Sequence, residues 1–402
     1  MSALLPLEEA QARLIAQASP LAEERVPLAA ASGRYLARPA CARLAVPPAD
    51  VSAMDGWAVR VADLPGPWRT VGLSAAGRPW PGRLGPGEAV RIFTGAAVPP
   101  GADAVLLQEE AVEEAGLVRL AGPGPDRPGR HIRRAGQDAA SGAALAPAGA
   151  RLTPARIGLL AAAGLDAVCV RRRPRVALLA TGSELVPPGT VPGPGQIVSA
   201  NGVMLAALAA SEGANVRDLG IVPDDAAAIA RALAASAEEA DVLVTIGGAS
   251  VGAHDLVRPA VCAAGGEIAF WRIAVRPGKP LLAGRLGGAV LLGLPGNPVS
   301  SFVCALLFLL PLVRHLAGAD EPLPRLESAR AAVPLPAGGP RRDFQRARLE
   351  WRAGEPWVVP ARVQDSAMLS VLAGADALLV RPEHAPPAAA GTPVPVLRLW
   401  AA

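Results

Sequence analysis

The fold of this 402-residue chain is decided by the stretch RVALLATGSEL at residues 175–185. Its continuous apolar run, 176–180, predicts a strand buried on both faces, and the small polar residues after it predict a turn. A helix is expected next at 202–211, ended by Gly213, and then a strand at 215–221. The order strand, helix, strand is typical of a parallel α/β sheet.

Further along the chain the same alternation repeats. The expected elements are a helix at 225–239 and buried strands at 242–246 and 289–294. Asp224 or Asp225 would cap the helix. The apolar stretch 299–313 is shorter than the ~20 residues that a membrane span needs, and it contains Pro311, so it predicts a buried helix. These elements predict a doubly wound, mostly parallel sheet covered on both faces.

Outside this region the sequence changes character. Short apolar runs separated by Pro and Gly clusters at 41–137 predict a small β domain inserted into a helical one. Helices are expected at 2–18 and at 154–164, where Thr153 precedes a proline. Short alternating strands return after the proline-rich break at 322–324. The predicted domains are a helical linker domain at 1–40 and 138–174, the inserted β domain at 41–137, the α/β domain at 175–321 and a C-terminal β domain at 322–402.

The composition excludes several classes of protein. A net charge of +4 is too dilute for a nucleic-acid-binding face, and a hydrophobic content of 51% excludes global disorder. The four cysteines lie far apart, with no C-x-x-C pair and no His at zinc-finger spacing, so neither a disulfide framework nor a structural zinc site is expected. Glu8 and Glu9 stand where an export signal would need positive charge, so we expect a cytoplasmic protein.

The basic residues are unevenly used. Lys279 is the only lysine among 39 basic residues, and all the others are arginines. A lysine offers an oxyanion a compact point charge, which a planar guanidinium does not. Together with Arg276 it places two cations on the turn RPGKP at 276–280. Chance retention explains a single lysine equally well.

Three loops follow the predicted strands at their carboxyl ends, where ligands bind in doubly wound sheets. They are TGSE at 181–184, GGASVG at 247–252 and PGNP at 295–298. Glycines let the backbone approach a phosphate closely, and helix N-termini favour anions. Such turns are also ordinary architecture, so no single loop identifies a ligand. The P-loop pattern and a helix-opening G-x-G-x-x-G are both missing, which excludes P-loop NTPases and argues against ordinary dinucleotide enzymes.

Carboxylates lie beside these loops. Glu184 stands in the first loop, Asp255 follows the second, and Asp224 and Asp225 start a helix. A Mg²⁺ ion that bridges protein carboxylates to phosphate oxygens would explain this arrangement. A role as helix caps and turn formers explains Asp224 and Asp225 at least as well.

A family resemblance begins at residues 52–59. The segment SAMDGWAV there resembles the S-A-M-D-G-[YF]-A segment of the molybdopterin molybdenumtransferases, the MoeA family, which is related to the gephyrin E domain. The similarity continues in order through TG at 94–95, PGADAV at 100–105, RRAGQD at 133–138, TGSEL at 181–185, GGASVG at 247–252, PGKP at 277–280, GLPGNPVS at 293–300, FQR at 344–346 and SAMLS at 366–370. It therefore covers nearly the whole chain.

The resemblance implies a transferase of molybdenum cofactor biosynthesis. Such an enzyme inserts molybdenum from molybdate into adenylylated molybdopterin with Mg²⁺ present, and releases AMP. It also implies an α/β domain of the molybdopterin-binding type and an elongated homodimer, in which the linker domain takes part in dimerisation. The cleft of one subunit would then face the inserted β domain of the other. Further partners would be the molybdopterin adenylyltransferase and proteins that deliver the finished cofactor, with no nucleic acid and no membrane.

The resemblance also assigns roles to individual residues. Carried over by motif, the catalytic residues would be Asp55, Thr94, Glu184, Asp255 and Lys279, with Glu184 and Asp255 as the metal ligands. The substrate-binding residues would be Asp138, Thr181, Gly182, Ser183, Asp225, Gly247, Gly248, Ser250, Gly252, Arg276, Pro295, Asn297 and Pro298.

The chain departs from the family pattern at four positions. Trp57 stands where Tyr or Phe is usual, Ser183 for Asp, Ala249 for Val and Arg276 for Lys. Ser183 removes one possible carboxylate from the first loop. Two other functions stay open from the sequence: adenylylation of molybdopterin, and a non-catalytic molybdopterin-binding scaffold. The preference between molybdate and tungstate also stays open, because both are tetrahedral dianions of nearly equal size.

Overall fold

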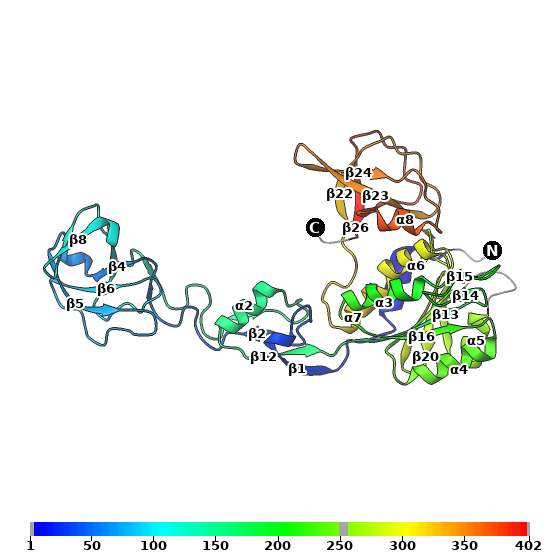
Figure 1. Ribbon diagram of the computed structural model, residues 1–402, viewed down its shortest axis with the longest axis horizontal. Coiled ribbons are helices and arrows are strands. Elements are labelled where there is room, and N and C mark those ends of the chain that lie inside the picture. The colour runs from blue at the N-terminus through cyan, green and yellow to red at the C-terminus, as the bar shows by residue number, and fades with distance from the viewer. Residues whose placement is uncertain (1–3, 249–255, 400–402) are drawn as a thin grey trace.

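The computed structural model describes residues 4–248 and 256–399. Figure 1 shows an elongated molecule with the inserted β domain at one end and the α/β body at the other. A narrow linker joins these two parts, and the C-terminal β domain stands on the α/β body. Residues 41–137 therefore lie far from the α/β cleft of the same chain.

The α/β body is built on a six-stranded mixed sheet. In spatial order its strands are β16 (Asn215–Val222), β13 (Arg175–Thr181), β17 (Val242–Ile246), β21 (Ala289–Leu294), β20 (Leu282–Leu286) and β18 (Glu267–Trp271). The first four are parallel to one another, and β20 and β18 are antiparallel additions at one edge. The four parallel strands confirm the predicted ones, whereas the two edge strands were not predicted.

Helices cover both faces of this sheet, as a doubly wound fold requires. Alternate residues of each strand point to opposite faces. Leu179 and Leu243 pack with α4 (Ala226–Ala237) and α5 (Val257–Ala263) on one face. On the other face lie α3 (Asn201–Ser211) and the long apolar helix at 298–316, packed on the strand residues Val176, Leu178, Val242, Val244, Val290 and Leu292.

The long apolar helix is interrupted by a wide turn. It comprises α6 (Pro298–Cys304), a π-helical turn at Ala305–Leu309 and α7 (Leu310–Leu316). By length and composition it could cross a membrane, but 89% of its apolar window is buried inside the protein, as expected for a core helix. Pro311 has no N–H for the carbonyl of Leu307, and Gln11 Nε2 donates to that carbonyl instead, at 2.8 Å.

Gln11 belongs to α1 (Leu7–Ile15), which packs on the α/β body. Leu7, Ala10 and Leu14 of this helix are buried in the same core cluster as the sheet. The expectation that residues 1–40 all belong to the linker therefore differs from the structure. The reason is that the apolar face of α1 fills the space beside the π-helical turn.

The linker contains two small antiparallel pairs and one helix. The pairs are β1 (Glu23–Pro27) with β12 (Ala167–Arg171) and β2 (Ala40–Cys41) with β11 (Ala144–Ala146). The helix is α2 (Pro154–Ala162), which Thr153 caps by accepting from the N–H of Arg156 at 3.3 Å. The predicted cap and start of this helix are confirmed.

The inserted β domain is a second six-stranded sheet. Its strands, in spatial order, are β7 (Ala104–Leu107), β4 (Gly56–Val59), β6 (Glu88–Ile92), β5 (Trp68–Ser74), β9 (Leu117–Leu120) and β8 (Ala111–Glu114). At its junction with the linker, β10 (Ile132–Arg133) pairs with β3 (Val51–Ser52). Trp57 and Trp68 are buried on one side of the sheet, which agrees with an independent small core.

The C-terminal domain is a closed sheet joined to the α/β body. The chain of pairings β23 (Arg342–Arg352), β24 (Glu355–Pro360), β22 (Glu327–Ala331), β26 (Pro393–Arg398) and β25 (Ala377–Arg381) returns to β23. A short helix, α8 (Leu369–Ala373), lies at its base. The body contributes β19 (Val275–Arg276), which pairs with the start of β23, so the two domains share a ladder.

Candidate functional site

A cleft of about 730 Å³ lies where β13, β17 and β21 end at their carboxyl edges. All three predicted loops contribute to it. The predicted residues that line it are Thr181, Gly182, Glu184, Gly247, Gly248, Pro295, Asn297 and Pro298. The structure thus brings together, within one cavity, positions that are up to 117 residues apart in the sequence, which was expected because parallel strands end at a common edge.

The glycines in these loops are required by close approach of the backbone. At Gly247, where φ is +91°, an added Cβ would lie 2.7 Å from the carbonyl oxygen of Thr181. At Gly182 it would lie 2.6 Å from Glu184 Oε2. The Glu184 carboxylate therefore folds back over the bare backbone of the first loop. Two loops in contact through glycine leave backbone polar groups accessible to an anion.

The first loop is held to the start of α4 by a reciprocal pair of hydrogen bonds. The Ser183 N–H donates to Asp224 Oδ2, and the Asp224 N–H donates to Ser183 Oγ, both at 3.1 Å. Asp224 also lines the cleft. Ser183 thus supplies the hydroxyl of this pair.

Asp225, which we predicted to bind substrate, has a different position. Its Oδ1 accepts from the Ala228 N–H at 2.6 Å, which is the N-cap bond of α4. Among the described residues of this pair, Asp224 is the one that lines the cleft. The cap assignment for Asp225, left open by the sequence, is confirmed.

The third loop opens the long apolar helix. Pro298 occupies the first helical position, where a missing N–H costs nothing. Ser301 Oγ donates back to the carbonyl of Pro295, and Asn201 Nδ2, from the start of α3, donates to the carbonyl of Gly296 at 2.6 Å. The Asn201 Oδ1 atom is buried and accepts no hydrogen bond from the part of the chain that the structure describes.

The two predicted cations lie on the turn beside the cleft. Lys279 is exposed, and the next residue, Pro280, lines the cleft. Arg276 has 62% of its side chain exposed and lies 3.9 Å from the carboxylate of Asp343 in the C-terminal domain. The buried thiol of Cys304, whose pKa is raised by burial, donates to the carbonyl of Gly278 at 3.6 Å and holds the turn in place.

The oxygen donors of the cleft suit a hard cation. Glu184 and Asp224 both line it, and Mg²⁺ is usually held by one or two carboxylates together with waters and substrate phosphates. Within residues 4–248 and 256–399 no group of three His, Cys, Asp or Glu side chains forms a metal cluster. The predicted residues Ser250, Gly252 and Asp255 lie outside the described residues.

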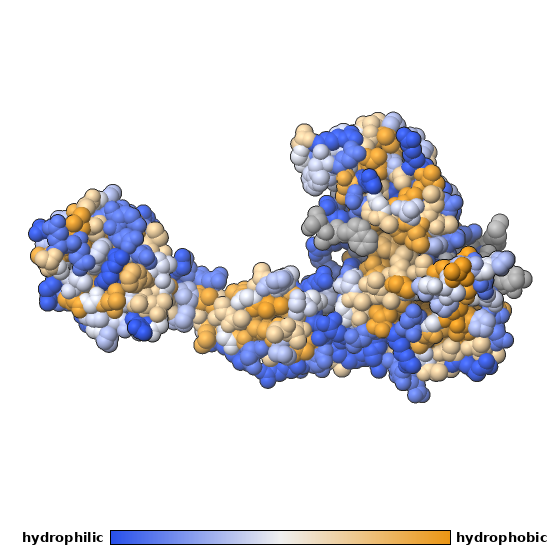
Figure 2. All heavy atoms as spheres, viewed as in Figure 1, coloured by the Kyte–Doolittle hydropathy of each residue, from blue (hydrophilic) through white to orange (hydrophobic). Residues whose placement is uncertain are grey.

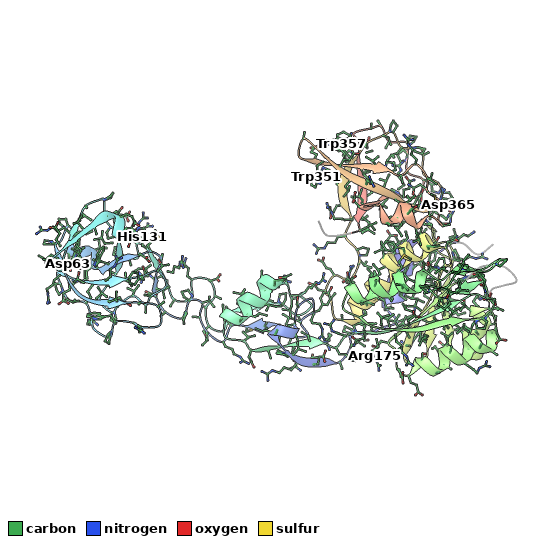
Figure 3. All side chains as sticks on the ribbon, in the orientation of Figure 1. Asp63, His131, Arg175, Trp351, Trp357 and Asp365 are labelled. Carbon is green, nitrogen blue, oxygen red and sulfur yellow. The ribbon has the colours of Figure 1, made fainter. Side chains whose placement is uncertain are left out.

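The C-terminal domain closes one side of the cleft. Ala367 and Leu369 from this domain line it, and the Ser366 carbonyl accepts from the Val299 N–H at 3.0 Å. The neighbouring Asp365 lies at the edge of the domain that faces the α/β body (Figure 3). Buried Arg346, of the FQR motif, donates to the carbonyl of Asp365 at 3.0 Å and so supports this segment.

Asp55 and Thr94 form a separate site on the inserted β domain. Asp55 Oδ1 accepts from both the N–H and the Oγ1 of Thr94, each at 2.7 Å. These two hydrogen bonds, with a smaller contribution from the charge of Arg91, lower the pKa of Asp55. The guanidinium of Arg91 stacks on the rings of Trp57 and Phe93, at 4.4 and 5.1 Å.

This second site and the cleft are not in contact within one chain. Asp55 and Thr94 flank β4 and β6, at the opposite end of the molecule from the cleft (Figure 1). Exposed Asp138 lies between β10 and β11, where the β domain meets the linker. The predicted residues therefore form two groups rather than one.

Several residues that line the cleft were not among the assigned site residues, although Asp224 was noted as a carboxylate beside the loops. They are Asp224, Asn201, Ser199, Ala200, Pro280, Ala367 and Leu369. The scarcity of asparagine in this chain could have identified Asn201, because it and Asn297 both contribute to the cleft. For Ala367 and Leu369 the sequence holds no local signal, since their contribution depends on how the C-terminal domain docks.

Comparisons with known proteins agree with this architecture. Three family models match in order: "MoeA N-terminal region (domain I and II)" at residues 5–164, "Probable molybdopterin binding domain" at 177–315 and "MoeA C-terminal region (domain IV)" at 328–399. The chain is 39% identical to molybdopterin molybdenumtransferase 2 of Mycobacterium tuberculosis over 387 residues, covering 93% of this chain and 94% of the relative. It is 38% identical to the molybdopterin molybdenumtransferase of Haemophilus influenzae over 352 residues, covering 85% of each.

A solved structure gives the same result for the fold. The molybdopterin biosynthesis MoeA protein of Pyrococcus horikoshii superposes with a TM-score of 0.82 at 30% sequence identity, covering 100% of both chains. The predicted fold class, a molybdopterin-binding-type α/β domain with small β domains before and after it, is confirmed. From its domains, its relatives and its structure, the chain belongs to the MoeA family of molybdopterin molybdenumtransferases.

Proposed function

We propose that this enzyme inserts molybdenum from molybdate into adenylylated molybdopterin, releases AMP and so forms the molybdenum cofactor. The observation that carries the proposal is the cleft itself, where two glycine loops, the carboxylates of Glu184 and Asp224 and the Lys279 turn meet. The names of the relatives support molybdenum insertion into molybdopterin. The proposal goes beyond these names because it specifies adenylylated molybdopterin as the substrate and AMP as the released product.

The cleft residues would each bind one charged group: a substrate phosphate, the metal ion or molybdate. The backbones of Gly182, Gly247 and Gly248 would bind the substrate's phosphates, because a side chain at these positions would block the approach. Glu184 and Asp224 would hold Mg²⁺, which when bound supplies positive charge where the phosphoanhydride breaks. Arg276 and Lys279 would attract the molybdate dianion to the rim.

The proposal includes a homodimer. The Asp55 carboxylate, held by two hydrogen bonds from Thr94, lies on the inserted β domain, far from the cleft of its own chain. In a two-fold dimer the β domain of one copy would reach the cleft of the other, so that each site uses both chains. A cytoplasmic location, with the adenylyltransferase and the cofactor-delivery proteins as further partners, belongs to the same proposal.

The test is a reaction with purified components. The protein is mixed with adenylylated molybdopterin, Mg²⁺ and molybdate, while AMP release and the activation of a molybdenum-free apoenzyme are followed together. We expect AMP only when molybdate is present, with matching activation. Tight substrate binding without AMP release would favour a scaffold. In a parallel reaction with molybdopterin and ATP, release of pyrophosphate with formation of adenylylated molybdopterin would favour an adenylyltransferase.

Substitutions in the cleft make the test specific. Glu184→Gln and Lys279→Ala should abolish molybdenum insertion, because each removes a charge that the reaction needs. Glu238→Gln, an exposed residue just past the end of α4, changes charge in the same domain away from the cleft and serves as the control. Normal cofactor yield from either cleft variant would contradict the role given to that residue.

A further inference from the structure

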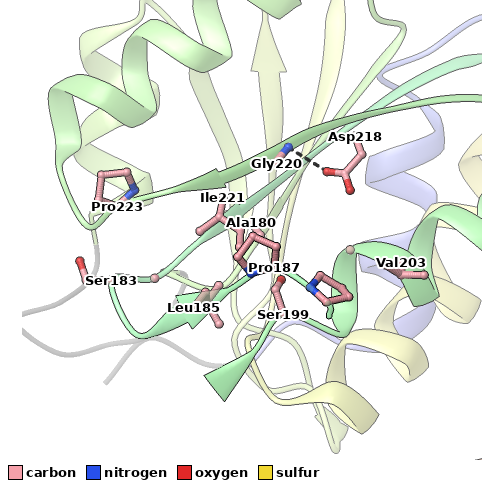
Figure 4. A pocket seen from close by; sticks show the side chains of 13 residues that line it. Ala180, Ser183, Leu185, Pro187, Ser199, Val203, Asp218, Gly220, Ile221 and Pro223 are labelled. Atoms are coloured by element: carbon pink, nitrogen blue, oxygen red, sulfur yellow. Dashed lines mark hydrogen bonds between the residues drawn. The ribbon is translucent and has the colours of Figure 1, made fainter. Parts of the chain in front are cut away.

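A second cavity, of about 480 Å³, adjoins the cleft (Figure 4). The two cavities share Ala180, Gly182, Leu185 and Ser199 as common walls. The second one lies between the edge strand β16 and the first turn of α3. It contains none of the carboxylates of the cleft, and the functional roles proposed so far leave it unused.

The walls of this cavity are mostly apolar. Pro187, Pro223, Val203 and Ile221 contribute stiff or branched side chains that surround it (Figure 4). Val203, which lines the cavity, is 57% exposed, so the cavity opens to the surface at an apolar side chain. Figure 2 shows hydrophobic groups on this face of the α/β body. An apolar cavity with few polar groups is typical of a site for a flat organic ring.

One carboxylate faces this apolar space. Asp218 Oδ1 accepts from the Gly220 N–H at 2.9 Å, which fixes the side chain at its place on β16. The other oxygen, Oδ2, points towards Gly202 in the first turn of α3, where an added Cβ would lie 3.7 Å away. A side chain much larger than that of alanine at Gly202 would therefore occupy the space beside Asp218 Oδ2.

We propose that this cavity binds the pterin ring of the substrate, with Asp218 accepting hydrogen bonds from its ring N–H and adjacent amino group. The inference rests on the proposed function, since it assigns one part of that substrate to a place. An ionised carboxylate only accepts hydrogen bonds. A pterin presents two neighbouring donors on one edge, whereas adenine presents an amino group flanked by acceptors. The lining thus favours the pterin over the adenine of the same substrate.

The connection between the cavities fits a substrate that extends through both. Ser183 lines the second cavity and Asp224 lines the cleft, and these two residues are joined by the reciprocal hydrogen bonds described above. Gly182, which lines both cavities, is the bare stretch of backbone between them. A ring bound beside Asp218 would therefore leave its phosphate side chain directed over Gly182 towards Glu184.

The experiment measures binding of two probes, pterin-6-carboxylate and AMP, to the full chain by calorimetry. Asp218→Asn keeps an oxygen for the Gly220 N–H but replaces one acceptor by a donor, so we expect pterin affinity to fall about 10- to 100-fold. Gly202→Leu fills the space beside Asp218 and should remove saturable pterin binding. AMP affinity should be unchanged in both variants, and Glu238→Gln should leave both affinities unchanged.

Each other outcome overturns the inference. Equal pterin affinity in Asp218→Asn and the parent protein would remove Asp218 from recognition, and a selective loss of AMP binding would make this a nucleotide cavity. Absence of saturable pterin binding to the parent protein would also refute it. Melting temperatures of both variants confirm that each remains folded. If molybdenum insertion proceeds normally in Asp218→Asn, only this inference fails; if the parent binds pterin through Asp218 but inserts no molybdenum, only the proposed function fails.

Discussion

The Asp55 carboxylate is kept ionised by the loop that faces it. Thr94 donates both its N–H and its hydroxyl to Asp55 Oδ1, and hydrogen bonds to the charged form lower a carboxyl pKa. In Thr94→Val the N–H bond remains and the hydroxyl bond is lost. We expect the pKa of Asp55 to rise part of the way towards its ordinary value, measured by NMR titration of the side-chain carboxyl.

The matched control for this prediction is Thr70→Val. It removes a hydroxyl bond of equal length, 2.7 Å, from Glu113 in the same domain, outside the site. The pKa of Asp55 should not change in this variant.

Because the pKa of Asp55 is lowered in the folded protein, its contribution to stability exists above the unfolded-state pKa and is lost as the pH falls through the folded-state value. Thr94→Val should therefore lose that contribution at a higher pH than the parent; an unchanged titration would contradict the assigned cause.

Asp225 gives a prediction that separates a helix cap from a substrate ligand. Asp225→Ala should lower the free energy of unfolding by about 1 kcal/mol, because the Ala228 N–H loses its acceptor. Asp225→Asn should preserve it, since Asn caps equally well. Urea unfolding measures both changes. Loss of molybdenum insertion in a fully stable Asp225→Asn variant would show that the carboxylate also contacts substrate.

At the level of single residues, the sequence predicted the backbone of the cleft better than its charges. Gly182, Gly247 and Pro298 could be placed there because parallel strands end at one edge and loops must follow them. The choice between Asp224 and Asp225 could not be made, since it depends on which of two adjacent side chains turns towards Ser183 and which towards the helix. Neighbouring residues of the same type carry no difference that a pattern can detect.

Among the elements, the interrupted helix at 298–316 depends on a hydrogen bond from a distant segment, because α1 supplies the donor for the Leu307 carbonyl. Pro311 leaves the Leu307 oxygen without its helical donor, and Gln11, 6% exposed, supplies one from α1. Gln11→Met keeps the shape of the side chain but leaves that buried oxygen unpaired. We expect the urea midpoint of the α/β body to fall by the equivalent of about 1–3 kcal/mol.

A control is available just past the end of α1, and a rescue is available in the long apolar helix. Gln17→Met removes an exposed hydrogen bond to the Arg13 carbonyl and should change stability little. Pro311→Ala restores an N–H at the interrupted turn, so the double variant with Gln11→Met should recover part of the loss. Purely additive effects of the two substitutions would show that Gln11 does not replace the missing helical donor.

Helices and strands could be predicted from the sequence where burial alone determines them. They could not be predicted where pairing or packing with a distant segment determines them. The apolar runs of β13, β17 and β21 are buried on both faces and could be identified from hydrophobicity. The edge strand β18 has mixed burial, and β20, between β18 and β21, is a short strand interrupted by the exposed Arg285. Both are placed by antiparallel pairing next to β21. The position of α1 on the α/β body similarly depends on Gln11 and the π-helical turn, which lie 296 residues apart.

At the scale of the whole molecule, the cleft and the Asp55–Thr94 pair of one chain do not meet. The cleft lies in the α/β body, and the Asp55 carboxylate lies in the inserted β domain just before β4, towards the other end of the molecule (Figure 1). A linker of paired strands with its own apolar core, rather than a bare connecting loop, separates them. An arrangement of this kind makes sense if the β domain serves the cleft of a second copy.

Mixing two inactive variants tests this arrangement. Asp55→Asn and Glu184→Gln should each abolish molybdenum insertion alone, because every site of either homodimer lacks one carboxylate. After unfolding and refolding together, half of the dimers contain one chain of each kind, and each mixed dimer has one intact site, so we expect about one quarter of the parent activity. Mixing Asp55→Asn with the double variant Asp55→Asn, Glu184→Gln should restore nothing. If the site were completed within one chain, the first mixture would also stay inactive, and this result would contradict a site shared between two copies.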